Sequence, residues 1–381
     1  MSEWTTIRLG SVVRTNTTAY SPKEGWKYVN YLDTGNLTEN VIDAIQYIDL
    51  ANEKLPSRAK RKVQINSILY STVRPNQKHF GIIKSMPENF LVSTGFAVID
   101  VIPEKVDADY LYFWLTQKTV VEQLHAIAEQ SVSAYPSIKA SDIENLEITL
   151  PPLTVQKSIA SILKSISDKM SHNSNINENL YDQMLTIFKN ARDTASWNRR
   201  KLSDVLTFFD NLRKPLSSIQ REKMEHIYPY YGATSIVDYV EDYLFEGTYI
   251  LVSEDGANVV DPAGHPLTQY THGKFWVNNH AHIVKGTNGY SEALVYALLG
   301  TLNMQSIVTG AAQPKINQAN LRNFEAVLPE SNEAQELSNI LNPMLQQMIL
   351  NDQENERLSA LRDTLLPQLM SGLFDISDIE L

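Results

Sequence analysis

The chain contains the same segment twice. Residues 131–190 reappear in register from Gly310 onward at a constant spacing of 178 residues, and this spacing takes Pro136 to Pro314 and Leu150 to Leu328. Self-similarity over this length indicates a tandem duplication in which each copy is one structural unit. A chain with two copies of one module presents two similar surfaces, so the repeat predicts a ligand with two similar sites.

The composition is that of an ordinary globular protein. With 381 residues, 43% of them hydrophobic and 20% charged, the chain is long enough for two or three domains that each bury a core. The absence of cysteine excludes disulfides and thiolate metal sites and fits a reducing compartment. Because the sequence has no run of about 18 apolar residues and no signal-peptide pattern at its start, we expect a cytoplasmic protein without a membrane partner.

The acidic charge is concentrated at the C-terminal end. From Glu330 onward there are ten acidic and two basic residues, which accounts for −8 of the net charge of −11. The preceding residues contain local basic runs, such as the one within 54–62. The acidic balance of the whole chain therefore does not exclude an anionic ligand such as nucleic acid.

Each copy is predicted to be a small α+β module followed by one long helix. Strand character, carried by β-branched and aromatic residues, is expected at 65–70, 90–102, 146–150, 248–253 and 275–284, and helical spacing at 108–129 and near 291–307. The expected boundaries are 1–150 and 196–329 for the two modules and 151–195 and 330–381 for the two helices.

Two seven-residue patterns predict that the long helices pair with each other. Asn173 and Asn351 occupy the same step of the two patterns, and a buried asparagine usually fixes the register between helices. Pro343 lies inside the second pattern, so the second helix is expected to kink or begin there. The repeated positions are Ile159, Ile166, Asn173, Leu180 and Ile187, and Leu337, Met344, Asn351, Leu358 and Leu365; a neighbouring stripe contains Ile162, Leu163, Met170, Ile176 and Met184.

Helix pairing constrains the whole architecture. A first helix from about residue 154 to about residue 192 would be roughly 55–60 Å long at 1.5 Å per residue. If the second helix is antiparallel to it, the modules sit at opposite ends. The predicted fold is therefore α+β, with two modules related by a pseudo-twofold axis and separated by a long antiparallel two-helix coiled coil.

Sequence motifs of catalysis are absent. The chain has no G-x-x-x-x-G-K-[ST] loop for a triphosphate and no G-x-G-x-x-G for a dinucleotide, and Asp261-Pro262-Ala263 only approximates the tetrapeptide with which amino-methyltransferases hold a flipped base. His265, His272, His280 and His282 are close in sequence, but without cysteine or a helical H-x-x-x-H pair they do not favour zinc. We expect no catalytic residue, metal or cofactor in this chain.

Several loop-like segments carry donors suited to phosphate oxygens and purine edges. Segment 71–79 follows an expected strand, and 230–234, 253–258 and 274–280 are comparable. For any single residue a solvated turn is the favoured explanation, by roughly two to one, so the segments are stronger candidates as groups. The candidate DNA contacts are Lys60, Arg61, Arg74, Asn76, Gln77, Lys78, His79, Lys84, Arg213, Lys214, Tyr231, Asn258, Lys274, Asn278, Asn279 and Lys315.

Two motifs resemble a known family. Segment 150–163, Leu-Pro-Pro-Leu-Thr-Val-Gln-Lys-Ser-Ile-Ala-Ser-Ile-Leu, resembles the start of the central conserved region in specificity (S) subunits of type I restriction-modification systems. Segment 361–372, Leu-Arg-Asp-Thr-Leu-Leu-Pro-Gln-Leu-Met-Ser-Gly, resembles the distal conserved region of that family. The second copy departs from the pattern at Leu328-Pro329-Glu330, where the first copy has two prolines.

The resemblance implies a function for each part. Each module would be a target-recognition domain that reads one half of a bipartite site in double-stranded DNA, and the helices would set the half-site spacing and dock two modification (methyltransferase) subunits. S-adenosylmethionine for adenine methylation, and ATP and Mg for translocation and cleavage, would be bound by modification and restriction partners, and this chain would not be an enzyme. Inserting one or two helical turns after Ser165, with a matching insertion after Pro343, should then change the permitted gap.

Two other functions stay open on the sequence. A coiled-coil scaffold that binds proteins through its two modules would respond little to salt, whereas a DNA reader should lose affinity steeply as ionic strength rises. A metal-dependent nuclease using Glu254, Asp255 and the histidines would cut DNA when supplied with divalent ions.

Overall fold

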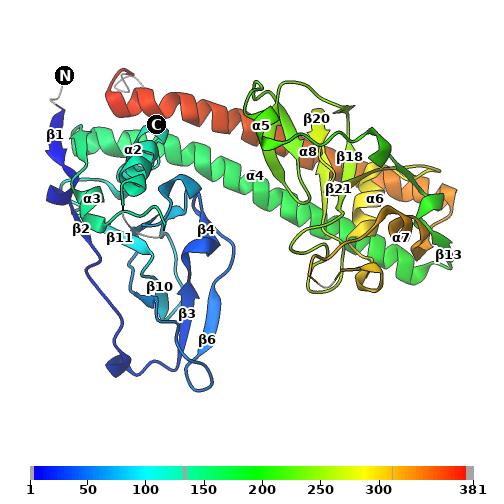
Figure 1. The fold of residues 1–381 in the computed structure, drawn as a ribbon, viewed down its shortest axis with the longest axis horizontal. Helices are drawn as coiled ribbons and strands as arrows, with labels where there is room; N and C mark the ends of the chain where they lie inside the picture. The colour runs from blue at the N-terminus through cyan, green and yellow to red at the C-terminus, as the bar shows by residue number, and fades with distance from the viewer. Residues whose placement is uncertain (1–3, 132–134, 311, 375–381) are drawn as a thin grey trace. The chain divides into compact units, whose positions relative to one another are not determined.

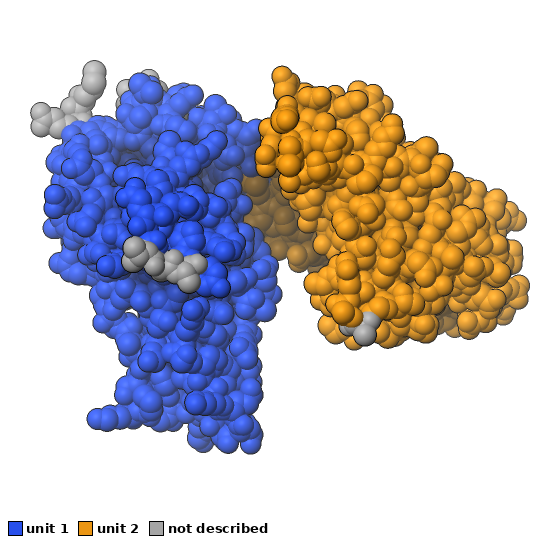
Figure 2. Space-filling view, viewed as in Figure 1, with its two compact units in different colours: residues 1–169, 357–381 blue, residues 170–356 orange. Residues whose placement is uncertain are grey.

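Two compact units make up the computed structural model, which describes residues 4–131, 135–310 and 312–374. Unit 1 consists of residues 1–169 and 357–381, and unit 2 of residues 170–356 (Figure 2). Residues 132–134 of the first repeat and the acidic end at 375–381 lie outside the described residues. Each unit contains one module and a part of each long helix.

Unit 1 is built on two four-stranded sheets and a strand pair (Figure 1). One sheet is antiparallel with the order β2–β11–β8–β9. The other has the order β6–β3–β10–β7, with β3 and β10 parallel. β1 pairs with β12 and connects the start of the module to its end. The strands are β1 (Thr5–Arg8), β2 (Val13–Thr15), β3 (Tyr28–Leu32), β6 (Gln46–Asp49), β7 (Ala59–Arg61), β8 (Ile68–Ser71), β9 (Phe80–Ile82), β10 (Phe90–Ser93), β11 (Phe96–Val101) and β12 (Glu147–Leu150), with a short hairpin of β4 (Leu37–Thr38) and β5 (Val41–Ile42).

Unit 2 repeats the topology of the two four-stranded sheets and of the strand pair, but its described strands include no counterpart of the β4–β5 hairpin. Its sheets have the orders β14–β21–β18–β19 and β16–β15–β20–β17, the second again with one parallel pair, β15 and β20, and β13 pairs with β22. The strands are β13 (Asn198–Lys201), β14 (Leu206–Phe208), β15 (Tyr228–Tyr231), β16 (Ile236–Val240), β17 (Phe245–Glu246), β18 (Tyr249–Ser253), β19 (Thr268–Thr271), β20 (Lys274–Val277), β21 (Ala281–Gly286) and β22 (Glu325–Leu328). The predicted use of one α+β module twice is confirmed.

The single strand expected over 90–102 is two strands in different sheets. β10 ends at Ser93 and β11 begins at Phe96, because the chain turns at Thr94 and Gly95. A Cβ atom at Gly95 would lie 2.8 Å from Cγ2 of Thr34, so this turn is closely packed. The expected strand at 275–284 divides in the same way into β20 and β21. The polar residues between the halves, Thr94-Gly95 and Asn278-Asn279-His280, mark a turn in the sequence, but they do not indicate that the chain changes sheet there.

The short helices are interrupted or shortened relative to the sequence prediction. Helical spacing over 108–129 corresponds to α1 (Ala108–Leu115) and α2 (Lys118–Glu129), and α1 begins where Asp107 accepts a hydrogen bond from the Tyr110 N–H. In unit 2, α6 (Glu292–Leu299) ends well before residue 307. The remaining short helices are α3 (Ala140–Glu144), α5 (Ser218–Arg221) and α7 (Gln318–Asn323); α3 and α7 keep the repeat spacing of 178 residues.

Two long helices, α4 (Leu153–Thr194) and α8 (Ser331–Ser371), run from one unit into the other. α8 does not begin at Pro343, because the helix starts at Ser331 and continues through the proline, where the Asn339 carbonyl loses its usual helical donor. Both helices contribute to both cores. Ile159 and Leu163 lie with Leu366, Leu369 and Met370 in the core of unit 1, and Met184 and Phe188 lie with Leu337, Leu341 and Leu345 in the core of unit 2.

Four asparagines pair the helices reciprocally within unit 2. Asn173 donates to the side-chain oxygen of Asn355 (2.9 Å), and Asn351 donates to that of Asn177 (2.8 Å). Asn177 also donates to the Met348 carbonyl (3.1 Å), and Asn355 donates to the Met170 carbonyl (3.2 Å). Each bond maps onto its counterpart by the repeat spacing of 178 residues. The expected antiparallel pairing is therefore observed here, and we call these four residues the asparagine ladder.

All ten positions of the predicted seven-residue stripes are buried or half-buried. The neighbouring stripe was less well predicted, because Ile176 is 45% exposed. Asn173 and Asn177 both face the partner helix, and Ile176 lies between them in sequence on another face. None of the described helices is both long and apolar enough to cross a membrane.

Candidate nucleic-acid interface

Three segments of unit 1 meet at the end of β8. The backbone N–H of Thr72 donates to the carbonyl of Gly95 (2.8 Å), and the N–H of Ile138 donates to the carbonyl of Thr72 (2.8 Å). The N–H of Arg74 donates to the carbonyl of Pro136 (2.9 Å). We call this arrangement the loop junction of unit 1; it consists of 72–74, 95 and 136–138.

The same junction forms at the end of β18 in unit 2. The N–H of Glu254 donates to the carbonyl of His280 (2.9 Å), and the N–H of Ile316 donates to the carbonyl of Glu254 (2.9 Å). A β-bridge joins Asp255 to Lys315, as another joins Val73 to Ser137 in unit 1. Lys315 and Ser137 are separated by the repeat spacing. The loop junction of unit 2, residues 254–255, 280 and 314–316, therefore repeats two of the three main-chain bonds and the bridge of unit 1 with different side chains.

Exposed polar side chains surround the loop junction of unit 1. Arg74 and Lys78 flank the 3-10 turn Pro75–Gln77, and both have positive φ angles, +47° and +57°. Non-glycine residues in this conformation cost about 1–2 kcal/mol, and such strain tends to occur at functional sites. The Arg74 guanidinium lies 5.3 Å from the ring centroid of Tyr135, whereas Lys78 is paired with Glu39 (2.8 Å). Asn76 and Gln77 are exposed, and His79 donates from Nδ1 to the Leu37 carbonyl.

Two carboxylates contact the exposed side chains of Lys315 and His280 at the loop junction of unit 2. Lys315 Nζ lies 3.0 Å from Glu254 and 4.0 Å from Asp255, and His280 Nδ1 lies 2.5 Å from Asp255. The side chains of Lys315 and His280 are 44% and 47% exposed, whereas those of Glu254 and Asp255 are only 12% and 15% exposed. The carboxylates therefore lie beneath the basic groups.

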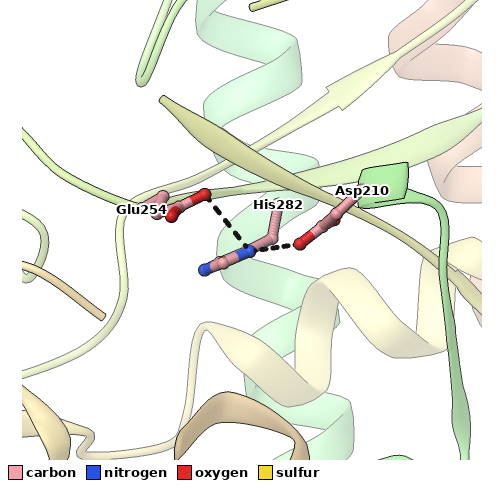
Figure 3. Close-up of side chains that lie close together, drawn as sticks. All are labelled: Asp210, Glu254 and His282. Atoms are coloured by element: carbon pink, nitrogen blue, oxygen red, sulfur yellow. Dashed lines mark hydrogen bonds and ion pairs between the residues drawn. The ribbon is translucent and has the colours of Figure 1, made fainter. Parts of the chain in front are cut away.

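A buried histidine continues this network into the module (Figure 3). His282 on β21 lies 2.6 Å from Asp210 and 3.7 Å from Glu254, and its Nε2 donates to the Ile316 carbonyl (2.8 Å). Arg213 lies 2.6 Å from Glu254. Ligand atoms of Asp210, Glu254 and His282 approach within 4.8 Å of one another, a spacing that suits a metal ion. Arg213 and Lys315 already supply positive charge to Glu254, so the geometry favours an ion-pair network over a cation site.

The two network carboxyls are held in their ionised form. Burial raises the pKa of Asp210, but the hydrogen bond and charge of His282 more than offset it, and the net pKa lies below the usual value. Burial likewise raises the pKa of Glu254, while the hydrogen bonds from Arg213 and Lys315 bring it below its usual value. The network therefore carries compensated charges at neutral pH.

The remaining candidates of unit 1 lie away from its loop junction. Lys60 is exposed on β7, a strand of the other sheet, and its neighbour Arg61 is half-buried, with a pKa lowered by burial. Lys84 donates to Asn66 and to Asp109 at the start of α1 (both 2.8 Å). The structure brings together 74–79 but does not join these three residues to them.

The candidates of unit 2 divide by exposure. Tyr231 and Asn278 are buried, with 7% and 8% exposure, so neither side chain is available at the surface. The Arg213 side chain is 15% exposed and bound within the ion network. Lys274 lies 4.4 Å from the ring centroid of Tyr243, and hydrogen bonding to Tyr243 raises its pKa. Lys214, Asn258 and Asn279 are exposed, and Lys274 and Lys315 are partly exposed.

Sequence reasoning did not select Tyr135 or His280 as DNA contacts. Tyr135 precedes the repeated Pro136, and His280 lies within a segment already considered, so position in the repeat was the available signal. Their roles depend on main-chain bonds between distant segments, which no local pattern predicts.

The chain belongs to the family described as the type I restriction modification DNA specificity domain. The family model matches residues 1–181 and again residues 195–360. The two matches correspond to the two repeats. The resemblance inferred from the two sequence motifs is therefore confirmed at the level of the family.

Specificity subunits are among its relatives. The type I restriction enzyme HindI specificity subunit of Haemophilus influenzae is 27% identical over 190 residues, which cover 50% of this chain and 40% of that protein. The MjaIX specificity subunit of Methanocaldococcus jannaschii is 20% identical over 370 residues, which cover 87% of this chain and 84% of that protein. The chain spans about two fifths of the length of the Haemophilus influenzae relatives it matches.

A solved structure shares the fold. The crystal structure of the type I restriction-modification system S subunit from M. genitalium aligns with a TM-score of 0.53 at 18% identity, covering 97% of this chain and 96% of that one. The predicted fold class, α+β modules with a long antiparallel helix pair, is confirmed by this likeness and by the elements described above.

Proposed function

We propose that this chain is a DNA-reading specificity subunit of a type I restriction-modification complex. Each module reads one half of a bipartite site in double-stranded DNA. The observation that carries the proposal is the repetition of one loop junction in two modules attached to one antiparallel helix pair. A ligand with two half-sites at a fixed separation suits this repetition, because the discrimination of the two halves adds.

The contacts with DNA come from candidates that are at least partly exposed and are not bound deep within the protein. Phosphate contacts position a protein, and contacts with base edges specify the sequence. We leave out Tyr231, Asn278 and Arg213, which are buried or bound within the protein, and Arg61, His79 and Lys84, which are half-buried or bound to neighbouring groups. The proposed contacts are Lys60, Arg74, Asn76, Gln77, Lys78, Lys214, Asn258, Lys274, Asn279 and Lys315.

The helices are proposed to dock two modification subunits. α8 exposes Ile340, Leu350 and Leu361, with exposures of 55%, 48% and 47%, and these side chains suit apolar contacts with another subunit. S-adenosylmethionine would be bound by the modification subunits, and ATP and Mg by restriction subunits where present. The chain itself would be non-catalytic.

One experiment tests the proposal directly. The chain is expressed with its modification subunit, and the methylated adenines are mapped across a genome. An interrupted two-part motif is the expected result, and methylation without a two-part motif would contradict it.

The scaffold alternative is separated from DNA reading by salt. Binding of the complex to duplex DNA that contains the mapped motif should weaken by several powers of ten between low and moderate salt if about six to ten phosphates are contacted. Affinity that is independent of salt would favour the protein scaffold.

Insertions in the helices test whether they set the gap between the two half-sites. The register of the helix pair determines where the second insertion has to be made. In the pairs Asn173–Asn355 and Asn177–Asn351 the residue numbers add to 528, which places Asp363, not Pro343, opposite Ser165. Insertion of two helical turns after both Ser165 and Asp363 should change the permitted gap and leave both half-site sequences intact. The same insertion after Ser165 alone is the control that should disrupt pairing. An unchanged gap in the doubly inserted protein would refute the spacing role.

A further inference from the structure

We propose that the loop junction is the base-reading position of each module, with Arg74 in unit 1 and Lys315 in unit 2 as the donors that specify a guanine. This inference rests on the proposed function. It assigns one specificity-determining residue to each half-site.

The two junctions share two main-chain hydrogen bonds and one β-bridge, while their side chains differ. Thr72 corresponds to Glu254. The backbone carbonyl of each residue accepts a hydrogen bond from the N–H of a buried isoleucine, and the backbone N–H of each donates to a carbonyl in the turn between two strands. At the equivalent bridge position, Ser137 is replaced by Lys315. Because main-chain atoms hold this frame, many side chains other than proline can be exchanged on it, and such exchanges can change the sequence that is read without changing the fold.

In each junction one exposed cation is held in place by its neighbours. Arg74 is fixed by its left-handed backbone and by the Tyr135 ring, and it has no carboxylate partner among the described residues. Lys315 is held over Glu254 and Asp255 yet remains 44% exposed. Restricting a long side chain before binding reduces the entropy lost on contact.

The other cations near these loops are less suited to reading bases. Lys78 is paired with Glu39, Lys84 with Asp109, and Arg213 with Glu254. Arg74 and Lys315 remain as the exposed cations carried by the junctions themselves.

The chemistry of both side chains fits guanine. Its major-groove edge presents two acceptors, O6 and N7, and arginine or lysine donating to them is the commonest specific contact. Glu254 and Asp255 act as positioning residues, because they orient Lys315 while being largely buried themselves.

The test uses the full chain with its modification subunit and compares methylated motifs. Arg74→Ala should relax one base pair in one half of the motif, and Lys315→Ala should relax one base pair in the other half, each by about 5- to 150-fold in discrimination. Lys315→Arg should restore discrimination. Asp255→Asn should weaken it in the Lys315 half only, an effect that general destabilisation would not confine to one half. Lys23→Ala and Lys223→Ala, exposed lysines outside both junctions, are the matched controls.

The outcomes separate this inference from the proposed function. A wild-type protein without a two-part motif contradicts the proposed function. A two-part wild-type motif that Arg74→Ala and Lys315→Ala leave unchanged, or that both variants lose uniformly, overturns the inference alone. If an alanine variant unfolds, Arg74→Gln or Lys315→Gln replaces it in the same comparison.

Discussion

The asparagine ladder predicts that two mutations in the helix pair will be strongly non-additive. Asn177 and Asn351 are buried, with 9% and 5% exposure, and Asn351 donates to Asn177 at 2.8 Å. Asn177→Leu removes the acceptor, and Asn351→Leu removes the donor. The double variant removes both, so it leaves neither member of this hydrogen bond without its partner.

The magnitude follows from what each variant leaves behind. A buried polar group that loses its partner costs about 1–3 kcal/mol, whereas replacing both partners with apolar groups is close to neutral. Each single variant should therefore lower the free energy of unfolding by about 1–3 kcal/mol. The double variant also loses the bonds from Asn177 to Met348 and Asp352 and from Gln347 to Asn351. It should therefore lose about 1–3 kcal/mol less than the sum of the two single losses, and this difference is the coupling energy.

Urea unfolding of the four proteins, followed by circular dichroism, measures this coupling. Asn175→Leu, an exposed position on the same helix, is the control and should change stability by less than about 0.5 kcal/mol. If the double variant loses the sum of the two single losses within about 0.3–0.5 kcal/mol, the reciprocal pairing does not stabilise the helices as argued.

Two further predictions concern unit 2. Glu254→Gln should destabilise the protein at neutral pH. The pKa of Glu254 is lowered in the folded protein, so its ionised form stabilises the fold at pH values above the unfolded-state pKa. This stability is lost as the pH falls through the folded-state pKa. The difference from wild type, measured by thermal unfolding, should therefore shrink from pH 7 toward pH 3, and a constant difference would contradict this role. Gly300→Ala should cost about 1–3 kcal/mol in urea unfolding, because its Cβ would lie 2.2 Å from the Tyr181 hydroxyl and 2.8 Å from Leu185 Cδ2. Gly35→Ala, where no atom lies within 4 Å of the added Cβ, is its control, and equal effects at both positions would contradict the packing argument.

The sequence predicted the features that depend on local pattern or on the repeat. The α+β modules and the helix pair follow from apolar periodicity and from the spacing of 178 residues. The exchange of partners in the ladder could not be predicted, because Asn177 and Asn355 lie outside the seven-residue stripe that marks Asn173 and Asn351.

The candidate site was harder to predict than the fold. Tyr231 and Asn278 lie in polar segments but are buried, since β15 and β20 are neighbours in one sheet. The loop junctions depend on hydrogen bonds between distant segments, such as Ile316 to Glu254. Polarity along the chain identified the segments that meet there, and only the fold shows which side chains remain exposed.

The hydrogen bonds that pair the two long helices are formed reciprocally by both repeats, whereas the contact between a module and the helices differs between the repeats. Every ladder bond joins one repeat to the other, so a change in one asparagine leaves a buried partner in the other repeat without its hydrogen bond. The contact between a module and the helices is not repeated in this way. In unit 2, Tyr270 on β19 donates to Asp352 (2.5 Å), whose pKa is raised by burial, whereas the repeat equivalent of Asp352 is Ser174.

The strand pairing within the modules shows the same difference between the two repeats. Tyr270 pairs with Ile250 of β18, and the matching position in unit 1, opposite Ile68 of β8, is Ile82. The polar contact between sheet and helix in unit 2 therefore has no counterpart side chains in the first repeat. A duplicated chain can vary such a contact in one copy at a time, but the ladder can change only in both copies together. The ladder therefore keeps reciprocal asparagine bonds from both repeats, whereas the Tyr270–Asp352 contact uses side chains that only the second repeat carries.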